Sequence, residues 1–105
     1  SQKERIQAEN ARIAVLNGTS WEGLAGETAD LLSSQGLNIG RIDNADHFEG
    51  KTILYDYTGN PATVQRILSL MELSESHLFH RSDEGQEADI VLILGSDWAR
   101  ENTLP

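Results

Sequence analysis

With 105 residues, 38% of them hydrophobic, the chain is long enough to form one domain with its own core. Its 17 acidic and 8 basic residues give a net charge of -9, which argues against nucleic acid and anionic lipid headgroups as direct partners. No apolar run approaches the roughly 20 residues of a membrane-spanning helix, so no direct membrane insertion is expected, and the absence of cysteine excludes disulfides and thiolate metal sites.

The two ends of the chain are predicted to lie outside the folded domain. Residues 1–10 carry one branched apolar side chain among charges and amides, which indicates a linker or frayed arm, with a short helix as the alternative. Residues 100–105 are expected to form a tail, which leaves a domain over residues 11–99. Because the chain opens on Ser1, we expect it to be a piece of a longer protein with its targeting signal elsewhere.

The first element of the domain is a strand that turns into a helix. Residues 12–16 are apolar at consecutive positions, which predicts a central strand covered on both faces. The Asn-Gly pair that follows is typical of a hairpin. However, Thr-Ser-Trp-Glu at residues 19–22 matches a capping box, and a helical apolar face continues to Gly36.

Three or four further strands and one more helix are expected. The second strand, residues 37–42, is interrupted by Gly40, which places it near a sheet edge. Asn60 and Pro61 mark the cap and first position of the second helix. The remaining strands are predicted at residues 52–57, at residues 77–81 as a short edge strand, and at residues 88–94 as the last, central strand.

This order, β-α-β-β-α-(β)-β, predicts an α/β (α+β) fold with a mixed sheet. A ferredoxin-like or split βαβ arrangement is expected, with a hairpin joining the second and third strands. A small α/β sandwich, built in three layers, is the alternative. Because the first and last strands are apolar on both faces, a two-layer fold would leave one sheet face open, to be covered by the N-terminal arm, a partner chain or another domain.

Several motifs in order resemble a known family. They are IAVLNGT with the following GLA, Asn44-Ala45, the TILYDY strand with Gly59 after it, and ADIVLILGSDW. Together, over residues 12–98, they resemble the C-terminal domain of LytR-type cell-envelope proteins. The resemblance implies an extracytoplasmic accessory domain without catalytic residues or cofactor, in a parent protein that can carry an anchor and a LytR-CpsA-Psr glycopolymer transferase domain. It also implies that the domain recognises peptidoglycan or wall glycopolymer, or positions its neighbouring envelope domain.

The predicted ligand site is the sheet end where the first and last strands finish. If these strands are adjacent and parallel, Trp21 and Trp98 lie at one end, where exposed rings could stack on sugars and polar neighbours could bind hydroxyls. The predicted residues are Asn17, Gly18, Thr19, Trp21, Asp97 and Trp98. The alternative is a buried indole that seals the sheet. The spacing of Gly18 and Gly23 imitates a phosphate loop, but Leu24 and Ala25 replace its Lys and Ser/Thr.

No metal site and no catalytic site are predicted. His77 and His80 would point to opposite faces of a strand. Asp43, Asp56 and His47 could serve acid-base chemistry, but their spacing does not require it. The alternatives to glycan recognition are a protein-protein interaction or homodimerisation module and, third, a small wall-glycan hydrolase.

Overall fold

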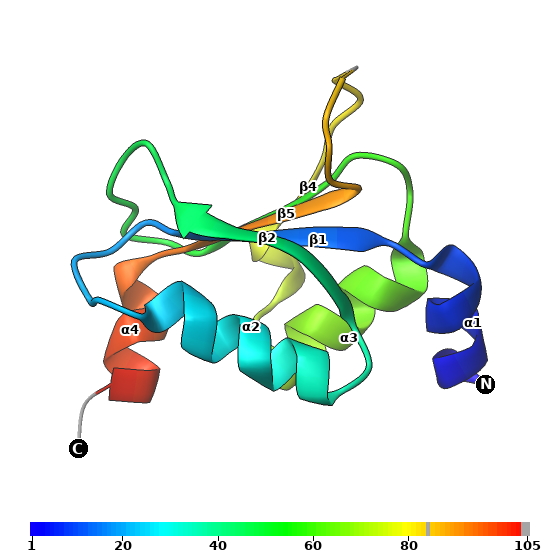
Figure 1. Cartoon of the computed structure of the whole chain (residues 1–105), viewed down its shortest axis with the longest axis horizontal. Coiled ribbons are helices and arrows are strands. Elements are labelled where there is room, and N and C mark those ends of the chain that lie inside the picture. The colour runs from blue at the N-terminus through cyan, green and yellow to red at the C-terminus, as the bar shows by residue number, and fades with distance from the viewer. Residues whose placement is uncertain (84, 104–105) are drawn as a thin grey trace.

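A computed structural model describes residues 1–83 and 85–103. Within them, a mixed sheet of five strands carries its helices on one face (Figure 1). The elements in chain order are α1 (Gln2–Glu9), β1 (Arg12–Asn17), α2 (Leu24–Ser34), β2 (Asn38–Asn44), β3 (Ile53–Asp56), α3 (Pro61–Met71), the 3-10 helix η1 (Glu75–His77), β4 (Leu78–His80), β5 (Ile90–Leu94) and α4 (Ser96–Thr103). The predicted α/β class and the order of its central elements are confirmed.

The strand order is β2-β1-β5-β3-β4. β1 is parallel to β2 and β5, whereas β3 is antiparallel to β5 and parallel to β4. The apolar strands β1 and β5 are therefore central, and β2 and β4 are the edges, as predicted. The expected middle hairpin is wrong: β1 and β5 separate β2 from β3. Helix α2 returns the chain to the strand beside β1, as a short crossover does, so the βαβ unit is not split and the fold is a small α/β sandwich of two layers.

The core lies between the sheet and α2 and α3. Alternate residues of each central strand point to the helices, and each helix buries one stripe of apolar side chains. The largest fully buried apolar residues are Ile13 and Val15 of β1, Leu54 of β3, Ile90, Leu92 and Leu94 of β5, Leu24 and Leu32 of α2, and Val64 and Ile67 of α3.

The N-terminal segment is part of the fold. Residues 2–9 form a helix capped by Ser1, so the linker interpretation is wrong and the short-helix alternative is correct. The Glu9 carboxylate accepts hydrogen bonds from the N–H groups of Ala62 and Thr63 at 2.9 and 2.8 Å, where the N-terminus of α3 favours an anion. Of the predicted tail, residues 100–103 continue α4, and residues 104–105 lie outside the described part of the chain. The described helices include none that is both long and apolar enough to cross a bilayer.

In the part of the chain that the structure describes, one face of the sheet carries no helix. In Figure 1 the helices α1 to α4 lie below the sheet, while the loops at residues 45–52 and at residues 81–83 and 85–89 rise on the opposite side. Helix α1 packs beside α3, so the N-terminal arm does not cover the open face.

Candidate functional site

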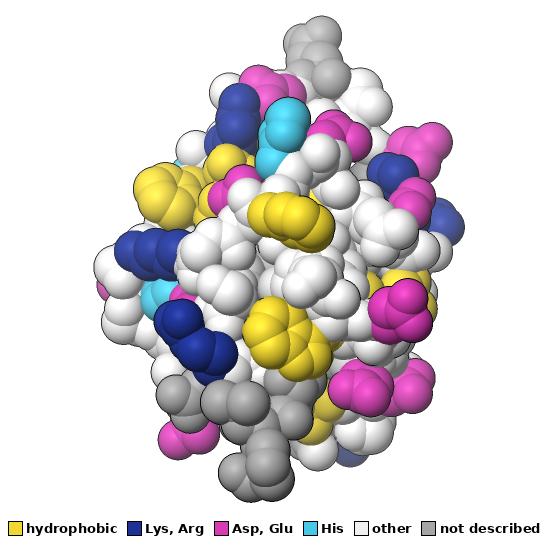
Figure 2. All heavy atoms as spheres, turned by 90° about the vertical axis from the view of Figure 1, so that its left-hand side faces the viewer, with side chains coloured by type: hydrophobic (Ala, Val, Ile, Leu, Met, Phe, Trp, Pro, Cys, Tyr) yellow, Lys and Arg dark blue, Asp and Glu magenta, His cyan; other side chains and the backbone are white. Residues whose placement is uncertain are grey.

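The predicted site lies at the carboxyl ends of β1 and β5. Asn17 of β1 pairs with Leu94 of β5, so the segments that follow these strands meet at one end of the sheet, as predicted. The loop at residues 45–52 crosses this end: Glu49 N–H donates to the carbonyl of Gly18, and its carbonyl accepts from Ser96 N–H. Figure 2 looks onto this end, where hydrophobic side chains stand among polar atoms.

Asn17 and Thr19 shape the turn after β1. Asn17 is buried; its Nδ2 donates to the carbonyl of Trp21 at 2.8 Å, and its Oδ1 accepts from Thr19 N–H at 3.0 Å. Thr19 Oγ1 accepts from Trp21 N–H at 3.1 Å. The predicted capping box is therefore wrong, because these bonds hold residues 17–21 in a turn. Helix α2 begins one turn later, with Gly23 as its N-cap at φ 80°.

Gly18 is required by close packing of two backbones. Its N–H donates to the carbonyl of Leu94 at 2.9 Å, and a Cβ at this position would lie 2.6 Å from that same oxygen. Gly18 thus allows the end of β1 to pack closely against the end of β5. This packing alone explains why a glycine is present.

Two exposed aromatic rings border a hollow at this end. Trp21 is 37% exposed and Phe48 is 81% exposed. Both line a cavity of about 240 Å³ together with Thr19, Ser20 and Glu49. Sequence reasoning missed Phe48, although an aromatic residue within the polar loop at residues 43–51 was a visible signal.

Trp98 points into the protein instead of toward this hollow. It is 8% exposed, and its indole Nε1–H donates to Thr28 Oγ1 of α2 at 2.9 Å. The alternative interpretation, an indole that seals the sheet, therefore describes Trp98. Three of the predicted residues line the hollow: Gly18, Thr19 and Trp21. Asn17 does not line it but holds the turn through its hydrogen bonds. Trp98 belongs to the core.

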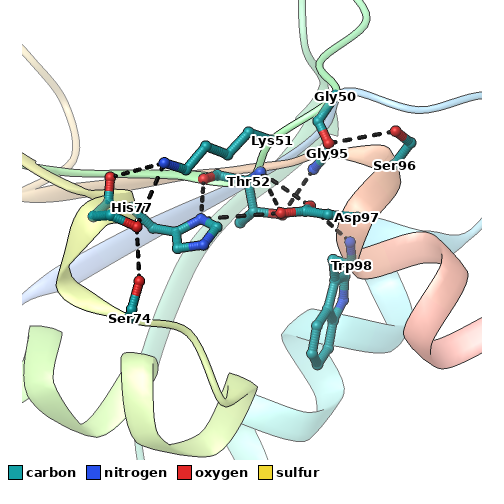
Figure 3. A network of polar contacts seen from close by, with 10 residues as sticks. Gly50, Lys51, Thr52, Ser74, His77, Gly95, Ser96, Asp97 and Trp98 are labelled. Atoms are coloured by element: carbon teal, nitrogen blue, oxygen red, sulfur yellow. Dashed lines mark hydrogen bonds and ion pairs between the residues drawn. The ribbon is translucent and has the colours of Figure 1, made fainter.

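Asp97 organises a polar network behind the hollow (Figure 3). Its Oδ1 accepts from the hydroxyl and the N–H of Thr52 at 2.7 and 3.0 Å, and from Trp98 N–H at 2.7 Å. Thr52 Oγ1 in turn accepts from Gly95 N–H at 3.0 Å. His77 Nδ1 lies 2.7 Å from the Thr52 carbonyl oxygen and 4.0 Å from Asp97. The network fastens the start of β3 to the start of α4.

This network predicts an acid-dependent loss of stability. Burial raises the pKa of Asp97, but the hydrogen bonds from Thr52 and Trp98 and the nearby His77 together outweigh burial and hold that pKa below its ordinary value of 3.8. Because the folded pKa is depressed, ionised Asp97 stabilises the fold above pH 3.8, and this contribution is lost as the pH falls through the folded pKa. In urea unfolding, wild type should exceed Asp97→Asn in stability at pH 7, and the two should converge in acid. A difference that does not change with pH would contradict this.

The other titratable candidates are not brought together. Asp43 lies on β2 and pairs with Arg41 at 2.9 Å, whereas Asp56 lies on β3, beyond β1 and β5. Asp56 is 2% exposed and accepts from Gly59 and Asn60 N–H in the turn before α3. Among the side chains of residues 1–83 and 85–100, no group of three or more His, Asp or Glu is placed to hold a metal ion.

Comparisons with known proteins agree with this architecture. Residues 10–98 match a family model described as the LytR cell envelope-related transcriptional attenuator, LytR_C. The structure is similar to the crystal structure of the soluble domain of a conserved hypothetical secreted protein from Mycobacterium marinum, with a TM-score of 0.61 and 20% sequence identity over 92% of this chain and 70% of that chain. At that identity the likeness shows the fold alone. No curated protein matches the chain.

Proposed function

The chain belongs to the LytR C-terminal family, whose model it matches over residues 10–98, and we propose that it is an extracytoplasmic accessory domain that recognises cell-wall glycan. The family description supports a role at the cell envelope. In this proposal the domain binds and positions, while any glycopolymer transfer belongs to a neighbouring domain.

The observation that carries the proposal is the pair of exposed rings at the hollow. Trp21 and Phe48 line the same cavity and are both exposed. Sugar rings present C–H-rich faces that pack on aromatic surfaces, and their hydroxyls need hydrogen-bonding partners at the rim. Thr19, Ser20 and Glu49 supply such groups beside the rings.

The charge of the protein favours one class of wall polymer. At a net charge of -9, the domain repels polymers that carry a phosphate on each repeat. The residues that line the hollow include Glu49 but no Lys or Arg. The largely uncharged sugar backbone of peptidoglycan therefore suits this hollow better than a polyanionic glycopolymer.

Sedimentation with insoluble peptidoglycan tests the proposal. Wild type should co-sediment, and Trp21→Ala or Phe48→Ala should each weaken binding by about three- to tenfold, which is the loss expected for one aromatic contact. Phe79→Ala is the matched control, because Phe79 is also exposed (47%) but lies on β4, outside the hollow. Wild type that stays in the supernatant, or equal losses for all three variants, would overturn the proposal.

A protein-interaction or homodimerisation module is the second candidate. Its support is the sheet face that carries no helix (Figure 1). Two copies, each with a net charge of -9, repel one another. This repulsion disfavours homodimerisation relative to the binding of an uncharged glycan. A dimer mass in solution scattering that reverts to a monomer on Phe79→Glu, a change at an exposed residue of the open face, would favour homodimerisation over glycan recognition.

A further inference from the structure

A single row of paired residues crosses the open face of the sheet. In register, Arg41 of β2 lies opposite Ala14 of β1, Ala14 opposite Val91 of β5, Val91 opposite Tyr55 of β3, and Tyr55 opposite Phe79 of β4. Residues paired in register share one face of a sheet. This row therefore has a cation at one edge, small aliphatic side chains in the middle and aromatic rings at the other edge.

A β-bulge at Gly40 puts the cation on this face. Ile13 pairs with Ile39 but Ala14 pairs with Arg41, so Gly40 is an extra residue in β2. In a regular ladder of the same residues, Gly40 would pair with Ala14 and Arg41 with Val15, on the helix side. The bulge pairs Arg41 with Ala14 instead, on the open face. A Cβ on Gly40 would also lie 2.7 Å from Cγ of Arg12. Gly40 thus makes room for the Arg12 side chain, which lies across it.

The row runs through a groove of about 750 Å³. Ala14, Leu16, Val91 and Ile93 supply its aliphatic floor, Tyr55 and Tyr57 line it from β3 and the residue after it, and residues 85–88 close one end. From β2 to β3 the groove crosses three strand spacings, or about 14 Å. These four floor residues have no hydrogen-bonding side chain, whereas the remaining lining includes polar side chains: Arg12, Arg41, Tyr55, Tyr57, Gln86 and Glu87.

Arg12 is the cation of this groove that can bind an anionic ligand. The Arg41 guanidinium is paired with Asp43 at 2.9 Å, and Glu87 lines the wall. Arg12 is exposed, and among the side chains that the structure describes its guanidinium has no ion pair. A guanidinium beside an apolar surface binds a carboxylate through a charge-assisted, two-point hydrogen bond.

We propose that this groove binds a carboxylate with an apolar chain, of the fatty-acid type. The carboxylate binds Arg12, and the chain lies across Ala14 and Val91 toward Tyr55. A sugar acid carries hydroxyls around its whole ring, and those that lie on the aliphatic floor would lose water without gaining a hydrogen bond, which costs free energy. The groove shares no lining residue with the hollow at Trp21, so this site is separate from the proposed glycan site.

Titration with decanoate below its micelle concentration, followed by amide NMR of the isotope-labelled full chain, tests the site. Decanoate should shift the amide signals of Ala14, Val91 and Tyr55 saturably. Decanol, which has the same chain without the charge, should bind about tenfold more weakly, the difference a charged head makes on an arginine. N-acetylmuramic acid, a sugar carboxylate, should leave these signals unshifted.

Matched variants distinguish a specific effect of the Arg12 guanidinium from the effect of removing any one positive charge. Arg12→Gln should reduce decanoate affinity to that of decanol, whereas Arg5→Gln, on exposed α1, should change nothing. Gly40→Ala keeps the charge but displaces Arg12, so it should also lose the preference for decanoate over decanol. None of the three should alter sedimentation with peptidoglycan, which keeps this test independent of the glycan proposal. Absence of saturable decanoate binding to wild type, equal binding by Arg12→Gln, or stronger binding of N-acetylmuramic acid would each overturn the proposal.

Discussion

Replacing Trp98 with alanine is expected to lower the free energy of unfolding by about 3–5 kcal/mol, because it removes a large buried ring and leaves a cavity. The indole is 8% exposed and belongs to the core between the sheet and α2. Its Nε1–H also donates to Thr28, which would lose that partner. Urea unfolding followed by circular dichroism measures the loss.

Two variants serve as controls. One measures the contribution of the indole hydrogen bond, and the other measures the cost of removing a tryptophan that is not in the core. Trp98→Phe keeps most of the ring and should cost about 1–2 kcal/mol, largely the lost hydrogen bond. Trp21→Ala should cost less than about 1 kcal/mol, since that ring is partly exposed. If Trp98→Ala proved no more costly than Trp21→Ala, the inward placement of Trp98 would be wrong. The large cost also makes Trp98→Ala unsuitable as a binding-site variant.

Replacing Asp56 with alanine is expected to cost about 3–5 kcal/mol, because it removes the acceptor of two buried donors of Asn60 and of the Gly59 N–H. The Asp56 carboxylate accepts from Gly59 N–H at 3.1 Å, from Asn60 N–H at 2.8 Å and from Asn60 Nδ2 at 3.0 Å. These bonds fix the turn that starts α3. His80 Nδ1 lies 3.8 Å away on the exposed side.

Asp43→Ala is the control for Asp56→Ala in the same unfolding assay. Asp43 is exposed and forms a surface ion pair with Arg41, which contributes about 0–1 kcal/mol. Asp56→Asn, which retains one acceptor oxygen, should fall between the two. Equal losses for Asp43→Ala and Asp56→Ala would show that the buried carboxylate does not hold the turn.

Much of the fold was predictable because its signals are local. Residues 12–16 and 88–94 are apolar without alternation, and only central strands need apolar residues on both faces. Pro61 marked the start of α3 because proline fits the first helical position. The partner of each strand was not predictable in this way. β2 and β3 are separated because β5 pairs with both β1 and β3. Such pairing joins residues far apart in the sequence, and no local sequence pattern predicts it.

The candidate site was predictable in position but not in orientation. Parallel central strands end at the same edge, so the segments after residues 17 and 94 had to meet there. Which way each tryptophan points depends on the element that follows its strand. Trp98 stands on the first turn of α4, which turns it toward Thr28 of α2, whereas the bonds of Asn17 and Thr19 hold Trp21 in a turn outside the core.

The bulge at Gly40 has a consequence for comparison with related chains. In a relative whose equivalent strand keeps the same residues but pairs without the bulge, Gly40 would lie opposite Ala14 and the arginine opposite Val15, on the helix side. The aliphatic and aromatic parts of the open face would stay, since these come from other strands. A one-residue change in the pairing of an edge strand therefore separates charged from uncharged open faces among members of one family, with little change in sequence.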